Sequence, residues 1–206
     1  MKKLLLSVAL VAGLGAAVNA QDNPIKIGVK AGVAFPNVSI SDAGEDVKTK
    51  TNASFYFGGT VDVSISKMFS VQPGLTLIGK GTKIDESENL STTLSNMYLE
   101  LPVNLLANFP VGSGKVFVGA GPYYSMALSG KYKFTGAGET VKEDVKFGSD
   151  GDFKRGDFGL NFLGGYQLSN GFNVHAGYGI GLSNISSDSD GKIKNKLFSI
   201  GVGFSF

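Results

Sequence analysis

Eight segments of the chain alternate between apolar and polar residues, and this alternation restricts the fold more than any other feature. Successive side chains of a β-strand point to opposite faces, so a period of two is typical of a strand with one apolar and one polar face. In 25–35, Ile27 and Val29 share one face while Lys26 and Lys30 share the other. The other alternating segments are 55–65, 70–81, 97–107, 116–128, 158–168, 172–182 and 198–206.

The length and spacing of these segments indicate membrane-crossing strands. A strand of about ten residues, rising about 3.3 Å per residue and tilted by 40–45°, spans roughly 23–25 Å, which is the height of the apolar band of an outer-membrane barrel. Short connections also alternate with long polar ones, as an up-and-down barrel with both termini in the periplasm requires. The long connections are 36–53, 82–96, 129–156 and 186–196.

The glycines indicate which face of the strands is the inner one. The chain has 30 glycines, and most of those that fall within the strands lie on the polar face, such as Gly32, Gly119 and Gly201. Eight strands enclose a lumen barely wide enough for side chains, so small residues belong on the inner face. We therefore expect a closed eight-stranded antiparallel transmembrane β-barrel with its apolar face toward lipid. The alternative is a secreted, soluble lipocalin-like barrel that binds a small apolar ligand and has its apolar face inward.

The first twenty residues are typical of a signal peptide. Lys2 and Lys3 precede an apolar stretch over 4–18, and the small residue Ala20 follows as a cleavage site. We expect cleavage there, which leaves 21–206 as the barrel domain with 17 basic and 17 acidic side chains. Such a balance gives no basic patch for nucleic acid. The absence of cysteine excludes disulfides, thiolate catalysis and Cys-ligated metal.

Several segments resemble the PorT-like outer-membrane β-barrel proteins of Gram-negative bacteria. The segment 98–106, YLELPVNLL, is similar to a strand of that family, as are 71–75, 119–123, 178–185 and 201–206. The resemblance implies an outer-membrane barrel and allows a part in protein secretion, but it assigns no activity. Pro73, Pro102 and Pro122 fall inside strands, and since proline cannot donate to a strand ladder, we expect β-bulges there.

Charged residues on the polar face predict a network inside the lumen. Buried charges are tolerated only when they are paired and hydrogen-bonded. We expect Asp62 to lie diagonally between Lys26 and Lys30, and Lys80 to face Glu100 on the next strand; Asp157 is a further lumen candidate. Such a network fixes the strand register and plugs the lumen, or alternatively forms a path for protons or ions.

The sequence offers no catalytic, cofactor-binding or metal-binding residues. A lipid-modifying outer-membrane enzyme would need a histidine and a serine at the outer rim, whereas the single histidine, His175, falls on the inner face near the periplasmic end. A solute-conducting porin would need a wider barrel of 16 or more strands. The acidic loop clusters, such as Asp85–Glu88, have no fixed spacing and are typical of solvated loops.

The end of the chain predicts how the barrel is anchored and assembled. We expect Phe198 near the outer interface and Phe204 and Phe206 near the periplasmic one, as parts of two aromatic girdles. A terminal phenylalanine also resembles the signal read by the outer-membrane assembly machinery. The sequence thus predicts a small non-catalytic outer-membrane protein with a structural, adhesion or secretion-assembly role. Its expected partners are outer-membrane lipid, the assembly machinery and other envelope proteins.

Overall fold

The computed structural model describes residues 25–42, 45–47, 49–87, 90–136, 139–148, 151–187 and 191–206. The predicted signal peptide, residues 1–20, lies outside the described residues. Among the residues described, no helix has the length and apolar character needed to span a membrane.

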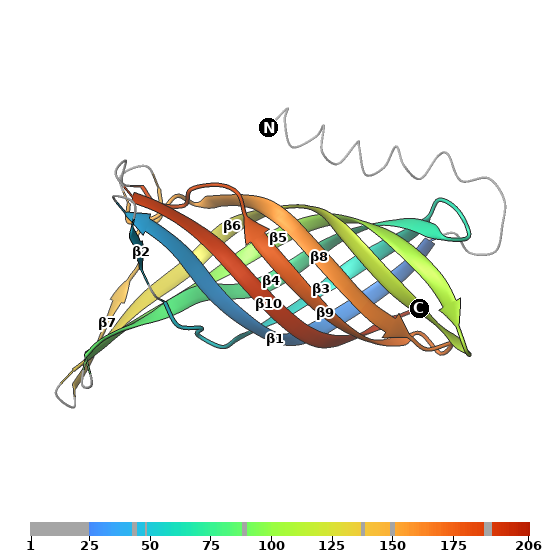
Figure 1. Cartoon of the computed structure of the whole chain (residues 1–206), viewed down its shortest axis with the longest axis horizontal. Helices are drawn as coiled ribbons and strands as arrows, with labels where there is room; N and C mark the ends of the chain where they lie inside the picture. Colours follow the sequence, from blue (N-terminus) through green and yellow to red (C-terminus); the bar gives the residue numbers. More distant parts are fainter. Residues whose placement is uncertain are drawn as a thin grey trace.

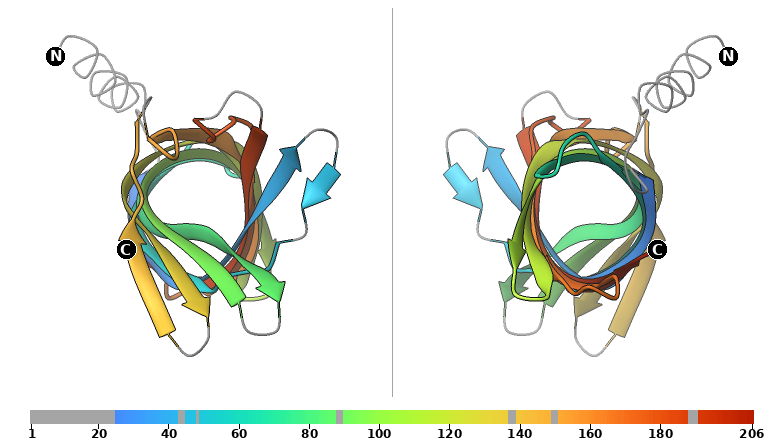
Figure 2. Two further views of the ribbon diagram at one scale, coloured as in Figure 1. Left: turned by 90° about the vertical axis from the view of Figure 1, so that its left-hand side faces the viewer. Right: turned by 90° about the vertical axis from the view of Figure 1, so that its right-hand side faces the viewer.

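Eight long strands form one closed antiparallel ring (Figures 1 and 2). Each strand pairs with its neighbours along the chain, and the last strand pairs with the first to close the barrel. The predicted eight-stranded up-and-down barrel is therefore confirmed. The strands of the ring are β1 (Ile25–Asp42), β3 (Ser54–Ser64), β4 (Phe69–Ser87), β5 (Leu90–Val111), β6 (Gly114–Gly136), β8 (Gly156–Gln167), β9 (Phe172–Gly181) and β10 (Gly191–Ser205).

The two ends of the barrel differ in their connections. At one end, the short-turn end, the strands are joined by the connections 65–68, 112–113 and 168–171. At the other end, the long-hairpin end, β2 (Glu45–Val47) pairs with β1 and β7 (Glu139–Asp144) pairs with β6. Figure 1 shows β2 and β7 together at this end, opposite the C-terminus.

The outer face of the ring is apolar and the inner face is polar. Ile27, Leu101 and Ile200 point outward and are 61%, 52% and 51% exposed. Ser125 and Asp157 point inward and are fully buried. This is the reverse of a soluble barrel and matches the predicted faces. We call the outward apolar residues of the ring the apolar belt.

Glycines on the inner face make room for large lumen side chains. A Cβ atom on Gly201 would stand 2.1 Å from the hydroxyl oxygen of Tyr56, and one on Gly32 would stand 2.2 Å from the carbonyl oxygen of Ile200. No side chain fits at either position without displacing the paired strand or the Tyr56 ring. Crowding of the lumen therefore accounts for the glycines of the polar face.

Several strands extend beyond the predicted boundaries at the long-hairpin end. The segments 82–87, 90–96 and 129–136, predicted to be parts of loops, are paired strands that continue β4, β5 and β6. With β7 they form what we call the protruding sheet. The prediction was wrong here because segments such as Ser91–Thr93 lack the alternation that a bilayer imposes, although threonine favours strands on either face.

The prolines inside strands do not cause the expected bulges. The register is unchanged on both sides of Pro73, Pro102 and Pro122. Register shifts occur instead between Asp85 and Ser87 and between Met97 and Tyr98, outside or at the edge of the proline-containing stretches. The shift at Met97 and Tyr98 thus marks the transition from barrel to protruding sheet, and the shift between Asp85 and Ser87 lies farther out in the β4–β5 hairpin.

Candidate functional site

The candidate site is the lumen, where inward side chains of five strands meet near the long-hairpin end. Lys80 of β4 lies between two carboxylates, Glu100 of β5 and Asp157 of β8. The distance from Lys80 Nζ to Glu100 Oε2 is 3.0 Å, and the distance from Nζ to Asp157 Oδ2 is also 3.0 Å. All three side chains are buried. We call these three residues the charge cluster.

Every carboxylate oxygen of the charge cluster accepts a hydrogen bond or faces Lys80. The Lys80 ammonium donates to Ser125 Oγ at 2.9 Å, and Ser125 in turn donates to Glu100 Oε2 at 3.0 Å. Because isolated buried charges are unstable, this set of donors is what allows three ionised groups to remain in the lumen. The other donors are Asn161 to Glu100 Oε1 (3.1 Å), Asn195 to Asp157 Oδ2 (3.0 Å), Tyr123 to Asp157 Oδ2 (3.2 Å) and Ser183 to Asp157 Oδ1 (3.1 Å).

Two tyrosine rings fill the space beside the cluster. Lys80 Nζ lies 4.2 Å from the ring centroid of Tyr123 and 5.2 Å from that of Tyr98, within the range of cation–π attraction. The void beside Lys80 and Glu100 measures only about 10 Å³, about the space of one water molecule. The charge cluster and these rings therefore fill the lumen at this level.

An apolar cap covers the lumen on the long-hairpin side of the charge cluster. Val145 and Phe153 are buried against Leu94 of β5 and against Ile185. Phe147 packs both on this group and on the lumen cluster that contains Tyr98. Backbone hydrogen bonds hold the segment in place, from Val145 N to Gly130 O at 2.9 Å and from Lys154 N to Ile185 O at 2.8 Å. The described part of the long connection 129–156 thus closes one end of the barrel.

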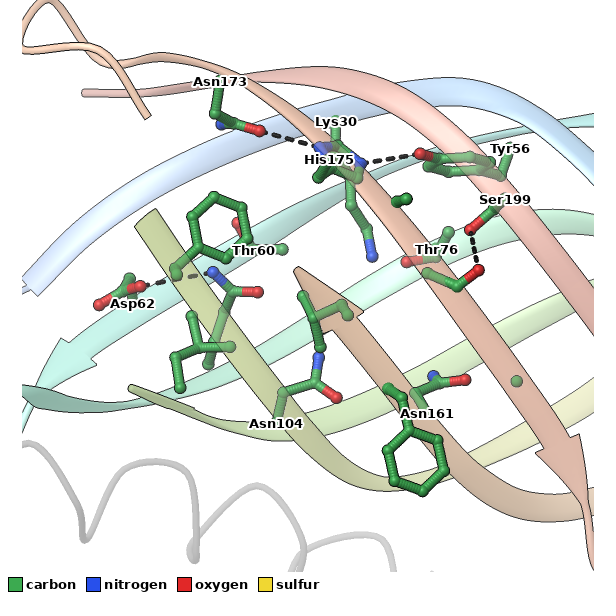
Figure 3. A pocket seen from close by; sticks show the side chains of 18 of the residues that line it. Lys30, Tyr56, Thr60, Asp62, Thr76, Asn104, Asn161, Asn173, His175 and Ser199 are labelled. Atoms are coloured by element: carbon green, nitrogen blue, oxygen red, sulfur yellow. Dashed lines mark hydrogen bonds between the residues drawn. The ribbon is translucent and has the colours of Figure 1, made fainter. Parts of the chain in front are cut away.

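A cavity of about 100 Å³ lies on the short-turn side of the charge cluster (Figure 3). Lys30, Thr76, Asn104 and His175 line it, and Glu100 borders it from the charge cluster. Thr76 Oγ1 and Asn104 Oδ1 are buried and have no hydrogen-bond partner among the described residues. Polar groups of this kind are typical of a hydrated cavity.

His175 is fixed in the wall of this cavity by two hydrogen bonds. Its Nδ1 lies 2.8 Å from Asn173 Oδ1, which can only accept, so Nδ1 carries the proton. Its Nε2 therefore accepts from the Tyr56 hydroxyl at 2.7 Å. Figure 3 shows Tyr56 and Asn173 on either side of the imidazole. Both ring nitrogens are thus engaged, on the inner face as predicted.

The predicted lumen charges divide into two groups. Lys80 and Glu100 form an ion pair, as predicted, but they do not face each other in the strand register. Lys80 stands opposite Asn96 and Glu100 stands opposite Thr76, so the two long side chains reach across the offset. Asp62 stands directly opposite Lys26, so its expected diagonal position was wrong. The prediction failed because a shift of two residues leaves the alternation unchanged, so the alternation does not encode the register of β1 and β3.

Lys30 stands apart from these pairs. Its ammonium lies 6.0 Å from the ring centroid of Tyr56 and forms no ion pair or hydrogen bond within the part of the chain that the structure describes. Lys30 faces the cavity in Figure 3. The sequence identified it as a lumen charge, but it did not reveal that Asp157, rather than Lys30, completes the buried cluster.

The aromatic residues of the chain end lie toward opposite ends of the barrel, and their role as girdles stays a prediction. Phe198 stacks on Phe35 across the β10–β1 seam with ring centroids 6.1 Å apart, toward the long-hairpin end. Phe204 and Phe206 make an edge-to-face contact at 5.1 Å near the short-turn end. The Phe206 amide donates to Ile27 O at 2.8 Å. The role of Phe206 as an assembly signal stays a prediction.

Residues 19–187 match the sequence model of the outer membrane protein beta-barrel domain family. No curated protein sequence matches the chain. Among solved structures, the chain is similar to the attachment invasion locus protein Ail of Yersinia pestis, with 15% identity over 88% of this chain and 98% of Ail and a TM-score of 0.46. It is similar to OprG of Pseudomonas aeruginosa, with 14% identity over 88% of this chain and 95% of OprG and a TM-score of 0.48. It is also similar to Neisserial surface protein A, with 15% identity over 87% and 97% of the two chains and a TM-score of 0.43.

Proposed function

The chain belongs to the outer membrane protein beta-barrel domain family, and from that premise we propose that it is a sealed, non-catalytic protein that acts through its protruding sheet. In this proposal both termini lie in the periplasm and the long-hairpin end lies outside the cell. The protein contributes to envelope structure and adhesion by presenting the protruding sheet to other surfaces.

The observation that carries the proposal is the closed lumen beneath an extended sheet. The charge cluster and the apolar cap fill the barrel, so the cavity on the short-turn side does not continue through it. The protruding sheet extends past the apolar belt, and all six residues of β7 are exposed. A barrel that conducts nothing and displays such a sheet is suited to contact rather than transport.

The position of the single histidine supports a non-catalytic role. Both nitrogens of His175 are engaged by Asn173 and Tyr56, on the short-turn side of the charge cluster. A lipid-modifying enzyme would need its histidine free at the rim, within reach of lipid. Membership in the PorT-like group, with a part in secretion, is supported only by sequence segments such as 98–106, which forms part of the wall in β5.

The proposed orientation can be tested by labelling single cysteines, because the natural chain has none. Val141→Cys places an exposed thiol on β7, and Asn170→Cys places one in a short turn. In intact cells a membrane-impermeant maleimide should label the first variant and not the second. Labelling of Asn170→Cys alone would reverse the orientation and overturn the proposal.

The adhesion role needs a separate test. In one variant, residues 84–92 are replaced by a two-residue Asn-Gly turn, which shortens the β4–β5 hairpin and leaves the ring intact. We expect cells that carry this variant to attach to glass and to one another less than cells that carry the parent, at equal amounts of folded barrel. Equal attachment would contradict the adhesion role while leaving the orientation untouched.

A further inference from the structure

A row of three lysines lies on the outward face of β10, directly beyond the apolar belt. Phe198 and Ile200 are outward residues of the belt and are 43% and 51% exposed. Lys196, Lys194 and Lys192 continue the same face of the same strand and are all exposed. Because alternate residues of a strand share a face, the belt and the lysines form one continuous outward surface.

The described residues that stand opposite Lys194 and Lys196 on the paired strands carry no opposite charge. On β1, Asn37 stands opposite Lys196 and Ser39 opposite Lys194, and both are neutral. On the other side, Ile180 of β9 stands opposite Lys196. Among the described residues, no ion pair or hydrogen bond involves the side chain of Lys194 or Lys196.

The outermost lysine has an acidic residue near it in the register. Asp46 of β2 stands opposite Ser41 of β1, which itself stands opposite Lys192. Lys194 and Lys196 have no such neighbour on the paired strands. The two inner lysines are therefore the ones on which a test should concentrate.

The height of Lys196 corresponds to the headgroup layer of a membrane, and Lys194 stands just beyond it. Lys196 is two residues beyond Phe198, and two residues of a strand tilted by about 40–45° rise roughly 5 Å, so Lys194 stands roughly 10 Å above that ring. The polar layer on each side of a bilayer is about 5–8 Å thick. The stems of the lysines can follow the neighbouring apolar surface while the ammonium groups reach the headgroups.

We propose that Lys194 and Lys196 bind phosphate groups of an anionic lipid in the leaflet at the long-hairpin end. This inference rests on the proposed function, because it requires that the barrel spans a membrane. A lysine ammonium offers three donors and a full charge to a phosphate. Alternate residues of a strand are about 6.6–6.8 Å apart, so one phosphate can accept from two neighbouring ammonium groups.

The test compares two double variants that remove the same charge. Lys194→Gln/Lys196→Gln removes the two inner lysines of the row. Lys133→Gln/Lys142→Gln is the matched control, because these exposed lysines are cross-strand neighbours on the protruding sheet, away from the belt. Each folded protein is titrated in neutral detergent with phosphatidic acid, and bound lipid is counted by native mass spectrometry.

We expect the parent to retain phosphatidic acid and to prefer it over phosphatidylcholine. Removal of one interfacial lysine should weaken binding roughly fivefold, so the Lys194/Lys196 double variant should bind about 25-fold more weakly and the control within about twofold of the parent. Equal binding by the parent and the Lys194/Lys196 variant would overturn the inference. Displacement of the lipid by soluble glycerol phosphate at similar concentration would also overturn it, because the site would then recognise free phosphate.

A failure of the proposed function would look different. Folding of the parent into vesicles of phosphatidylcholine alone is followed by the band shift of unheated samples in electrophoresis. If the parent does not insert into neutral vesicles, the membrane-spanning role fails. If it inserts and the lipid titration shows no difference between variants, only the lysine row is refuted.

Discussion

Lys80 and Glu100 form a buried ion pair of 3.0 Å although they do not face each other in the sheet. The register pairs Lys80 with Asn96 and Glu100 with Thr76, so the two Cα atoms are offset by four residues along neighbouring strands. The long lysine stem spans this offset and brings the ammonium to Asp157 of β8 as well. One cation thereby links the neighbouring strands β4 and β5 to β8, which is distant in sequence.

Removal of this cation should strongly destabilise the barrel. Lys80→Met would leave Glu100 and Asp157 buried without a counter-charge, which typically costs about 3–5 kcal/mol. Urea unfolding of the barrel in phosphatidylcholine vesicles measures the change. The triple variant Lys80→Met, Glu100→Gln, Asp157→Asn removes all three charges and should recover part of the loss. A single variant as stable as the parent would show that the cluster does not stabilise the fold.

The parent protein should not form a porin-like channel. The charge cluster, the tyrosine rings and the apolar cap fill the lumen, and an eight-stranded barrel has room for little more than its side chains. Recordings in planar bilayers should show no steady conductance above that of the bare membrane. A large and stable open level would contradict both the sealed lumen and the proposed function.

A charge on the apolar belt should destabilise the barrel, and a charge beyond the belt should not. Leu101→Arg places a cation on the lipid face of β5, where the expected cost near the midplane is about 2–4 kcal/mol. The matched control is Val141→Arg on β7 of the protruding sheet, where the side chain is exposed and stands opposite Phe134, and it is expected within about 0.5 kcal/mol of the parent. The free energy of unfolding in lipid vesicles, measured for both variants, tests this difference. If both variants match the parent, the outward face of β5 is not in contact with lipid.

An arginine on the inner face should prevent folding because it overpacks the lumen, not because it contacts lipid. A Cβ atom on Gly119 would already lie 2.3 Å from Leu106 Cδ2, so Gly119→Arg overpacks the lumen rather than charging the lipid face. We expect this variant to refold poorly in detergent as well as in lipid. Normal refolding in detergent would mean that the lumen is less crowded than the structure indicates.

Deletion of Phe206 should affect assembly in cells more than stability in vitro. The ring is 73% exposed and contacts Phe204, so its loss should cost less than the roughly 1.5–3 kcal/mol of a fully buried phenylalanine. If the terminal residue is an assembly signal, cells should accumulate unfolded precursor in the periplasm while refolding into detergent stays nearly normal. Equal, mild effects in both settings would leave Phe206 as a girdle residue alone.

The apolar cap should open locally without unfolding the ring. Phe153 is buried in the cap, and Phe153→Ala removes a large part of its packing. Lys146 and Lys154, which flank it, should then become sensitive to trypsin while the band shift of the folded barrel persists. The parent serves as the control and should resist cleavage at the same protease concentration. Loss of the band shift together with cleavage would mean that cap and ring unfold as one unit.

The sequence by itself determined the ring and its two faces. A bilayer forces every spanning strand to be apolar on one side and polar on the other, so segments such as 97–107 can be recognised without any knowledge of their neighbours. The same constraint placed Lys80, Glu100 and His175 on the inner face and Phe198 on the outer one. Beyond the bilayer this constraint ends, and the strands of the protruding sheet were therefore predicted to be loops.

Only the tertiary structure decided how these residues combine. The register of β1 and β3 sets Asp62 opposite Lys26 rather than diagonal to it, and alternation is unchanged by a shift of two residues, so the alternation does not encode it. The meeting of Lys80 with Asp157 depends on three strands whose contacts are long-range. Which segment covers the lumen likewise depends on the packing of Phe147 and Phe153 against Ile185, which is a contact between two different connections of the barrel.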